Sequence, residues 1–245
     1  MFKNTSKYNI NMKNIDILQE FKQNGKSVFT TRDLDKFIEN KKYTSVILNR
    51  LLKKQEICKI KKGIYYIKNA DVFSIASMIT FPSYISYLSS LYLSGIIEQI
   101  PTKIQVVSSK YLKPLDISET RVEFTKFSKK LLFGYYKKKI NGYVVFIAKP
   151  EKAVLDNLHQ TKMPFHYTKQ ILDELDKELL INYAKKFDSS VIKRIGYLLD
   201  LNGYDYHKEL KKYLSYRYTY LSLTNKKKGE KNKKWKIINN EGYYG

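Results

Sequence analysis

The chain has 245 residues, 43% of them hydrophobic, so it can bury a sizeable core despite a formal net charge of +23. Such an excess of lysine favours a polyanionic partner, either nucleic acid or an anionic membrane surface. No apolar run approaches the ~20 residues that span a bilayer, and residues 1–14 lack the apolar segment of a signal peptide. We therefore expect no membrane association and a cytoplasmic location, which the single cysteine, Cys58, also fits.

Residues 13–54 carry the periodicity of three helices. The first, at residues 13–24, ends at Gly25, and the second is capped by Thr30 or Thr31 and runs through Ile38. The third spans residues 42–54 and turns an apolar stripe inward. That stripe consists of Ile47, Leu48, Leu51 and Leu52.

The outward face of the third helix has the chemistry of a surface that binds the DNA major groove. Asn49 can pair bidentately with adenine, Arg50 can pair with guanine, and an exposed Val46 can touch a thymine methyl group. Phosphate contacts are expected from the hydroxyl groups and cations around them, and from the start of the second helix. These phosphate-contacting residues are Thr31, Arg32, Lys42, Tyr43, Ser45 and Lys53.

Residues 57–67 alternate in the period of two that is typical of a β-hairpin, with a tight turn at Lys62-Gly63. Such a hairpin would place Lys59, Lys61 and Lys62 against the DNA backbone or minor groove beside the third helix. Residues 41–68 contain nine Lys or Arg and one acid, Glu56, a local net charge of +8. Two helices and a basic hairpin in this order predict a winged helix-turn-helix. The alternative is a solvated charged face with no partner.

Beyond residue 70 the local charge falls and the pattern becomes mixed. A helix is predicted from Pro82 to Gly95, followed by strands at residues 104–109, 122–127 and 143–148. The last strand is continuously apolar and leads into a helix that begins at Pro150. Residues 165–216 have a helical pattern.

Two strand-like segments, residues 219–223 and 235–239, flank a lysine-rich run near the end of the chain. Residues 226–236 hold seven lysines against Glu230, a net charge of +6. We predict that this run is a long hairpin loop and a second basic surface that clamps DNA or contacts another polyanion; a merely solvated loop is the alternative. The lysines of this surface are Lys226, Lys227, Lys228, Lys231, Lys233 and Lys234.

The order of these parts resembles the AbiEi family, the antitoxin and repressor half of the AbiE toxin–antitoxin systems of bacteria and archaea. The resemblance covers nearly the whole chain and rests on five segments. It implies a winged helix that binds inverted repeats in the promoter of its own operon. It also implies a larger C-terminal domain that counteracts a nucleotidyltransferase-like toxin, in an arrangement usually classed as type IV. The segments are KKGIYY (61–66), SYISYLSSLYLSGIIEQIP (83–101), GY (142–143), IAKPEKAVLD (147–156) and WKIIN (235–239).

Residues suited to catalysis are sparse. The three histidines lie in separate segments without metal-ligand spacing, and no phosphate-binding glycine loop is present, so we expect no enzyme, no metal and no cofactor. Glu151, Lys152 and Asp156 resemble loose parts of a nuclease site, but charge at the start of a helix explains them equally. We interpret them as structural residues, or as an antitoxin surface that is complementary in charge to a partner.

The sequence therefore predicts an α+β protein with an N-terminal extension (1–12), a winged helix-turn-helix DNA-binding domain (13–70) and an AbiEi-like antitoxin domain (71–245). The last is expected to be mixed α/β with a helical C-terminal part. The expected function is repression of its own operon through double-stranded operator DNA in a bacterial or archaeal nucleoid, together with toxin neutralisation. The alternatives are a stand-alone regulator, a nucleic-acid-processing enzyme, and an RNA-binding protein that stacks bases on some of its 22 tyrosines.

Overall fold

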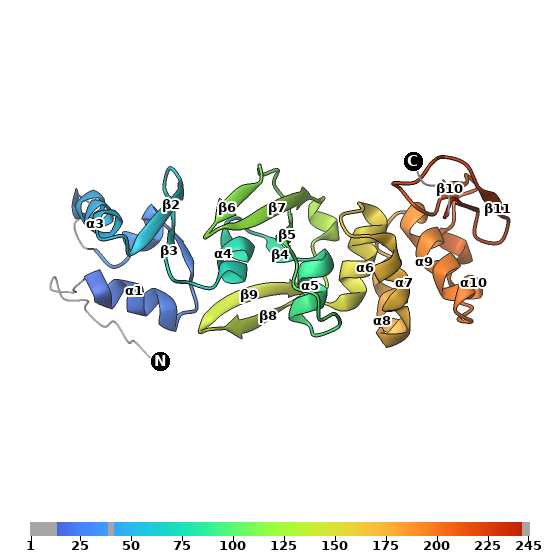
Figure 1. Cartoon of the computed structure of the whole chain (residues 1–245), viewed down its shortest axis with the longest axis horizontal. Helices are drawn as coiled ribbons and strands as arrows, with labels where there is room; N and C mark the ends of the chain where they lie inside the picture. Colours follow the sequence, from blue (N-terminus) through green and yellow to red (C-terminus); the bar gives the residue numbers. More distant parts are fainter. Residues whose placement is uncertain (1–13, 39–41, 242–245) are drawn as a thin grey trace, which may run out of the picture.

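The computed structural model describes residues 14–38 and 42–241, so the expected extension at residues 1–12 lies outside the described residues. Ten α-helices, three 3-10 helices and twelve strands in three sheets make up the described chain, which confirms the α+β class. The molecule is elongated, with the N-terminal elements at one end, a six-stranded sheet in the middle, and helices with a small third sheet at the other end (Figure 1). Among the described residues, no helix is both long and apolar enough to cross a membrane.

The N-terminal unit combines three helices with a three-stranded antiparallel sheet in the order β1-β3-β2. Its core is aromatic: Phe21 stacks on Phe29 with ring centroids 4.8 Å apart, and Phe37 meets Phe21 edge-on at 5.3 Å. The predicted helices and hairpin are confirmed, but α2 is a single turn that ends before Phe37, which reaches the core from the following turn. The elements are α1 (Asn14–Gln23), β1 (Val28–Thr30), α2 (Thr31–Leu34), α3 (Lys42–Lys53), β2 (Ile57–Lys61) and β3 (Ile64–Ile67).

Hydrogen bonds join this unit to the six-stranded sheet. The backbone N–H of Val144, in β9 (Tyr143–Ala148), donates to the carbonyl of Gly25 at 2.8 Å. Ser74, in α4 (Val72–Met78), lies 2.7 Å from the hydroxyl of Ser27 and donates to the Val144 carbonyl at 2.6 Å. Tyr143 packs in the N-terminal core itself. These buried contacts fix the orientation of the N-terminal unit on the sheet, and the domain boundary at residue 70 stays a prediction.

The central sheet has the strand order β6-β7-β5-β4-β9-β8. The three predicted strands are confirmed as β5, β7 and β9, whereas β4, β6 and β8 were not predicted. The helix expected from Pro82 is wrong in its first part, because residues Ser83–Ile85 form β4. This strand pairs with β5 on one side and β9 on the other, and such non-local pairing overrides the local helical pattern. The remaining bounds are β5 (Lys103–Ser108), β6 (Leu115–Ile117), β7 (Thr120–Lys126) and β8 (Tyr135–Ile140).

Helices cover both faces of this sheet, because successive strand residues point to opposite sides. Ile85, Val106 and Ile147 pack with α4 in one cluster. Tyr84, Val107 and Ala148 pack on the other face with α5 (Tyr87–Leu93) and α6 (Pro150–His159). Pro150 is the first residue of α6, as predicted.

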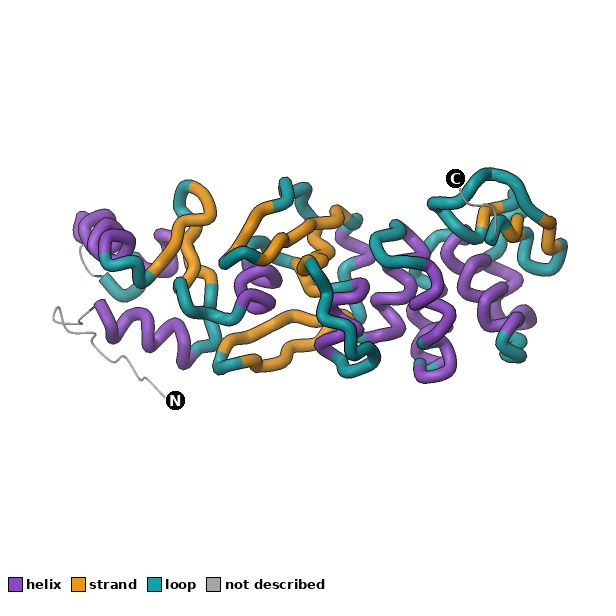
Figure 2. The backbone as a smooth tube through the Cα atoms, viewed as in Figure 1, coloured by secondary structure: helices purple, strands orange, loops and turns teal. Residues whose placement is uncertain are grey.

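Helices then fill the space between the central sheet and the C-terminal sheet (Figure 2). The latter has the order β10-β12-β11, and its outer strands flank β12. The predicted long hairpin is wrong: β10 and β12 are parallel, the lysine-rich segment crosses over between them, and β11 within it forms the hairpin with β12. The bounds are α7 (Phe165–Gln170), α8 (Lys177–Ala184), α9 (Ser189–Leu201), α10 (His207–Leu210), β10 (Thr219–Tyr220), β11 (Glu230–Asn232), β12 (Ile237–Asn239) and the 3-10 helices η1 (Lys129–Leu131), η2 (Leu172–Glu174) and η3 (Lys211–Tyr213).

Trp235 anchors the C-terminal sheet to α9. Its side chain is fully buried, and its ring occupies the space beside Gly196 in the middle of α9. A Cβ atom at Gly196 would lie 2.1 Å from Cζ3 of the indole, so only glycine allows this approach. The histidine at the start of α10, His207, packs edge-on against the same indole at 5.0 Å.

Replacing Gly196 with alanine should therefore destabilise the protein by about 1–3 kcal/mol, because overpacking exceeds the gain in helix propensity of about 1 kcal/mol. Denaturant unfolding followed by the fluorescence of the one tryptophan measures this directly. Asn182→Ala, on the exposed face of α8, is the control and should change the free energy of unfolding by less than about 0.5 kcal/mol. An unchanged midpoint for Gly196→Ala would mean that the indole is not seated on α9.

Candidate nucleic-acid interface

The outward face of α3 is open to solvent over its whole length. All seven predicted DNA-contacting residues of this helix are exposed, and its apolar members are exposed too: Tyr43 is 59% exposed and Val46 is 49% exposed. Leu48 and Leu51 are buried on the opposite face, as the periodicity predicts. The helix contains no acidic residue. The seven exposed residues are Lys42, Tyr43, Ser45, Val46, Asn49, Arg50 and Lys53.

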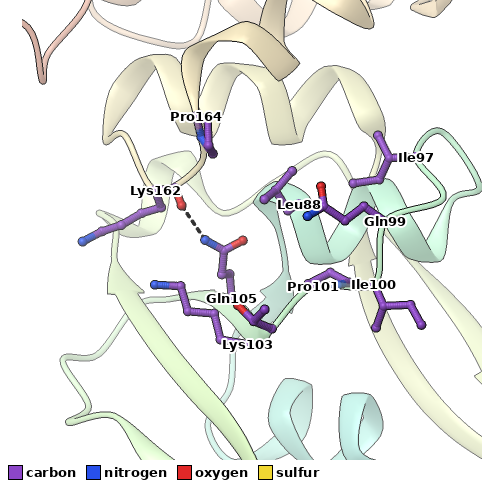
Figure 3. Close-up of a pocket in the computed structure, with 10 residues that line it drawn as sticks. Leu88, Ile97, Gln99, Ile100, Pro101, Lys103, Gln105, Lys162 and Pro164 are labelled. Carbon is purple, nitrogen blue, oxygen red and sulfur yellow. Dashed lines mark hydrogen bonds between the residues drawn. The ribbon is translucent and has the colours of Figure 1, made fainter. Parts of the chain in front are cut away.

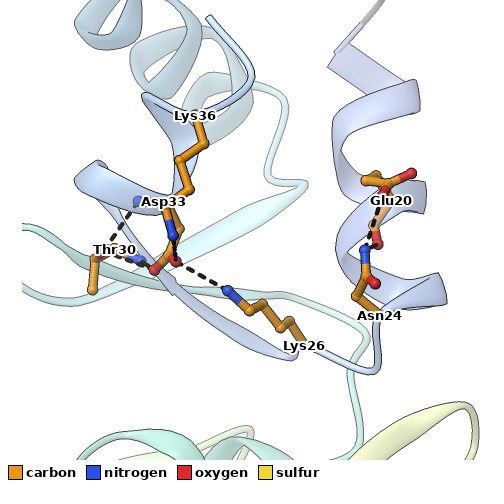
Figure 4. Close-up of polar contacts among 6 residues, drawn as sticks. All are labelled: Glu20, Asn24, Lys26, Thr30, Asp33 and Lys36. Carbon is orange, nitrogen blue, oxygen red and sulfur yellow. Dashed lines mark hydrogen bonds and ion pairs between the residues drawn. The ribbon is translucent and has the colours of Figure 1, made fainter. Parts of the chain in front are cut away.

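A capping box fixes the start of α2 (Figure 4). The Asp33 carboxylate accepts hydrogen bonds from the Thr30 backbone at 2.9 Å and from its hydroxyl at 2.7 Å, and the Lys26 ammonium lies 3.0 Å away. Burial alone raises the pKa of Asp33, but the bonds from Thr30 and the charge of Lys26 outweigh it, so the pKa lies below its ordinary value. The carboxylate is therefore ionised throughout the neutral range and holds the first turn of α2 in place.

One hydrogen bond joins the beginning of α3 to the end of α2. The buried hydroxyl of Thr44 donates to Asp35, the C-cap residue of α2, at 2.6 Å. Since charge-assisted bonds to carboxylates are short and strong, this contact ties the beginning of α3 to the end of α2. Sequence periodicity did not single out Thr44, because a buried threonine within a polar stretch carries no distinctive signal.

The hairpin β2–β3 is held against the start of α2. Gly63 turns the hairpin with a φ of +78°, and its carbonyl accepts a hydrogen bond of 3.1 Å from the Thr31 backbone. Thr31 is half-buried by this contact, whereas Arg32, the next residue, is exposed. The predicted hairpin lysines, Lys59, Lys61 and Lys62, are all exposed. The structure thus brings the hairpin tip and the first turn of α2 together, and α3 contacts β2, the first strand of the hairpin.

The predicted second basic surface lies at the opposite end of the molecule from α3 (Figure 1). All six of its lysines are exposed. Lys234 differs from the rest, because its ammonium pairs with Asp200 at 2.6 Å and with Asp205 at 3.1 Å. It connects the β11–β12 hairpin to the end of α9 and is not a free cation.

The expectation that Glu151, Lys152 and Asp156 form an antitoxin surface is wrong. Lys152 and Asp156 are completely buried, and Glu151 is 7% exposed. The cause is the position of α6, which packs against the sheet, α5, α8 and α9, so that no residue from 151 to 158 is left on a solvent face. Glu151 accepts a hydrogen bond of 3.2 Å from the backbone of Asp176, at the start of α8.

Lys152 and Asp156 instead form an ion pair within the core. One carboxylate oxygen contacts the Lys152 ammonium, and the other accepts hydrogen bonds from Ser86 at 2.7 Å and Tyr84 at 3.1 Å. Burial lowers the pKa of Lys152 against the attraction of Asp156, and it raises the pKa of Asp156 against these hydrogen bonds. The ammonium also faces four aromatic rings at 5.0–5.4 Å, which favour a cation. The rings belong to Tyr84, Phe127, Phe133 and Phe187.

A pocket of about 260 Å³ opens between α5, β5 and the loop after α6 (Figure 3). Its one buried polar side chain is Gln105, 3% exposed, whose amide nitrogen donates to the Lys162 carbonyl at 2.6 Å. The ion pair of Lys152 and Asp156 does not line it. Over residues 14–38 and 42–241, no group of three or more His, Cys, Asp or Glu side chains has the arrangement of a metal site. The prediction that the protein is not an enzyme remains a prediction.

No family model matches this chain, and no curated protein matches it in sequence. Its fold is similar to that in the crystal structure of RV2827C protein from Mycobacterium tuberculosis, with a TM-score of 0.59 over 91% of this chain and 89% of that chain. The two sequences are 13% identical, so the likeness is one of fold alone.

Removing one partner of the buried ion pair should be far more harmful than removing both. We expect Asp156→Asn to lower the free energy of unfolding by about 3–5 kcal/mol, because it leaves the buried Lys152 ammonium without a negatively charged partner. The double variant Lys152→Met with Asp156→Leu should cost less than this single change. Denaturant unfolding of the three proteins tests the ordering.

The exposed pair Lys185–Glu209 provides the control, and Glu209→Gln should cost less than about 1 kcal/mol. If Asp156→Asn were no more harmful than Glu209→Gln, the buried pair would not be holding α6 on the sheet.

Proposed function

We propose that this protein is a DNA-binding repressor and antitoxin of the AbiEi type. The observation that carries the DNA-binding part is α3, an acid-free helix that is fully exposed on one face beside a lysine-bearing hairpin. Helices of this size fit the major groove, and the excess of cations suits a phosphate backbone. The order α1-β1-α2-α3-β2-β3 with the sheet β1-β3-β2 supports the interpretation of residues 13–70 as a winged helix-turn-helix.

In this proposal α3 enters the major groove of an operator that overlaps the promoter, and repression follows from occlusion of the polymerase. Asn49, Arg50 and Val46 contact base edges, whereas the hydroxyl groups and lysines around them contact phosphates. The hairpin follows the backbone or minor groove with Lys59, Lys61 and Lys62. Thr31 contributes less to phosphate binding than the exposed Arg32, because the hairpin already covers Thr31 in part.

The antitoxin part of the proposal rests on the resemblance to the AbiEi family in the five sequence segments. It assigns residues 71–245 to the neutralisation of a nucleotidyltransferase-like toxin, either directly or through the toxin's target. The buried position of Lys152 and Asp156 gives the KPEKAVLD segment a structural task, so a neutralising surface has to lie elsewhere on this domain. The proposal places the protein on the nucleoid, at inverted repeats in its own operator.

Substitutions in α3 and in the hairpin should have different effects on DNA binding. Arg50→Ala should lose about 1–3 kcal/mol of discrimination at one base position, because it removes a contact to a base edge. Lys61→Ala should weaken all sequences alike and lower the slope of log K against log salt by about 1, because it removes one phosphate contact. Electrophoretic titrations on the DNA upstream of the operon, at several salt concentrations, separate the two effects.

Lys208→Ala is the matched control, since Lys208 is exposed in α10 at the opposite end of the molecule. It should leave both specificity and the salt slope unchanged. Equal affinity of the unaltered protein for operator and scrambled DNA would contradict sequence-specific repression.

The two activities should be separable in cells. The double variant Arg50→Ala with Lys61→Ala should lose about tenfold or more in repression of a promoter reporter, which corresponds to about 1.4 kcal/mol. The same variant should still restore growth when a nucleotidyltransferase-like toxin encoded beside this gene is expressed. A protein that represses but never restores growth would be a stand-alone regulator.

A further inference from the structure

A short segment at the C-terminal end of the molecule presents aromatic rings to solvent. Tyr216 is 80% exposed, the largest exposed fraction among the large hydrophobic side chains of the described residues, and Tyr218 is 36% exposed. The Arg217 guanidinium lies 5.7 Å from the centre of the Tyr216 ring, and its Nε donates to the tyrosine oxygen at 3.3 Å. The guanidinium therefore lies within cation–π range of the exposed ring.

A buried lysine holds this segment in place. Lys193, in α9, is completely buried, and its ammonium donates to the Ser215 hydroxyl at 2.8 Å and to the Arg217 carbonyl at 2.5 Å. The Ser215 backbone donates in turn to the Ser189 hydroxyl at 2.7 Å. Because a buried ammonium is costly without such partners, these bonds fix the backbone on both sides of Tyr216. The exposed ring therefore stands on an anchored segment.

Basic side chains lie close to the rings of Tyr216 and Tyr218. Residues 215–236 contain eight Lys or Arg against Glu230, a net charge of +7. The ammonium groups of Lys231 and Lys236 lie 5.5 Å and 5.6 Å from the centre of the Tyr218 ring. The lysine run itself is tied down, since Tyr220 donates to the Lys227 carbonyl at 3.1 Å.

We propose that the segment Ser215–Tyr218 and the lysines of the second basic surface bind single-stranded nucleic acid. An exposed ring gains by stacking on the face of an unpaired base, and in a duplex those faces are already covered by neighbouring bases. Lys231 and Lys236, whose ammonium groups lie beside the Tyr218 ring, would neutralise phosphates next to the stacked base. The site lies at the opposite end of the molecule from α3 and is independent of operator binding (Figure 1).

Fluorescence anisotropy with labelled oligouridylate and oligothymidylate, each about 12 nucleotides long, tests this. Tyr216→Ala should raise the Kd about 5- to 150-fold, the equivalent of about 1–3 kcal/mol for one base stacked on an aromatic side chain. Tyr216→Phe keeps the ring and should stay within about twofold of the unaltered protein. A lower Kd for oligouridylate than for oligothymidylate would identify RNA as the ligand, and equal values would identify any single strand.

Tyr111→Ala removes another exposed ring, 70% exposed and far from this segment in the chain, and should leave the Kd unchanged. All these side chains are exposed, so none of the changes threatens folding, and operator binding by Tyr216→Ala should be normal. The proposal is overturned if Tyr216→Ala binds single strands as tightly as the unaltered protein. It is equally overturned if a duplex of the same length competes fully, since that outcome reflects charge alone.

Discussion

The hydrogen-bonded ion pair of Lys152 and Asp156 determines how the helical half of the protein sits on the central sheet. An unpaired charge in such a position would cost several kcal/mol, so α6 can be buried on all sides only because both charges find partners. The partners Tyr84 and Ser86 belong to β4 and to the N-cap of α5, so one carboxylate links three elements. The carboxylate accepts its donors from Tyr84 and Ser86 in one arrangement of these three elements.

Buried cations recur at the other end of the helical half. Lys193 and Arg194 follow each other in α9, and within residues 14–38 and 42–241 neither meets a carboxylate at ion-pair distance. Backbone carbonyls and a hydroxyl accept their hydrogen bonds instead. Arg194 connects the Leu158 carbonyl at the end of α6 with the Tyr220 carbonyl in β10. These side chains attach the last part of the chain to the helices, as Trp235 does through Gly196. In a chain with 46 basic and 23 acidic residues, acids are scarce, and carbonyl groups take their place as acceptors inside the protein.

The sequence predicts those elements whose pattern is local. The inward stripe of α3, the turn at Gly63 and the apolar strand β9 follow from the spacing of a few neighbouring residues. β4 was not predicted because its three residues form a strand only by pairing with distant partners, among them Val107 in β5 and Ile147 in β9. The parallel pairing of β10 with β12 likewise could not be predicted, because it depends on the path of the chain between the two strands. The spacing of Lys152 and Asp156, four residues apart, was a usable signal for an ion pair between them, because such residues are neighbours on a helix.

The two candidate surfaces are held by one continuous framework. Gly25 bonds the N-terminal unit to β9, and Ser27 bonds it to Ser74 in α4. β9 leads into α6, and Lys193 of α9 attaches the segment that carries Tyr216. Coupling between distant sites requires an element with two arrangements, and each joint along this path is a buried hydrogen bond or a packed core. A ligand that binds equally well to every conformation of such a framework does not change the populations of those conformations. Occupation of α3 by duplex DNA would therefore leave Tyr216 free, and one molecule could hold an operator and a single strand at the same time.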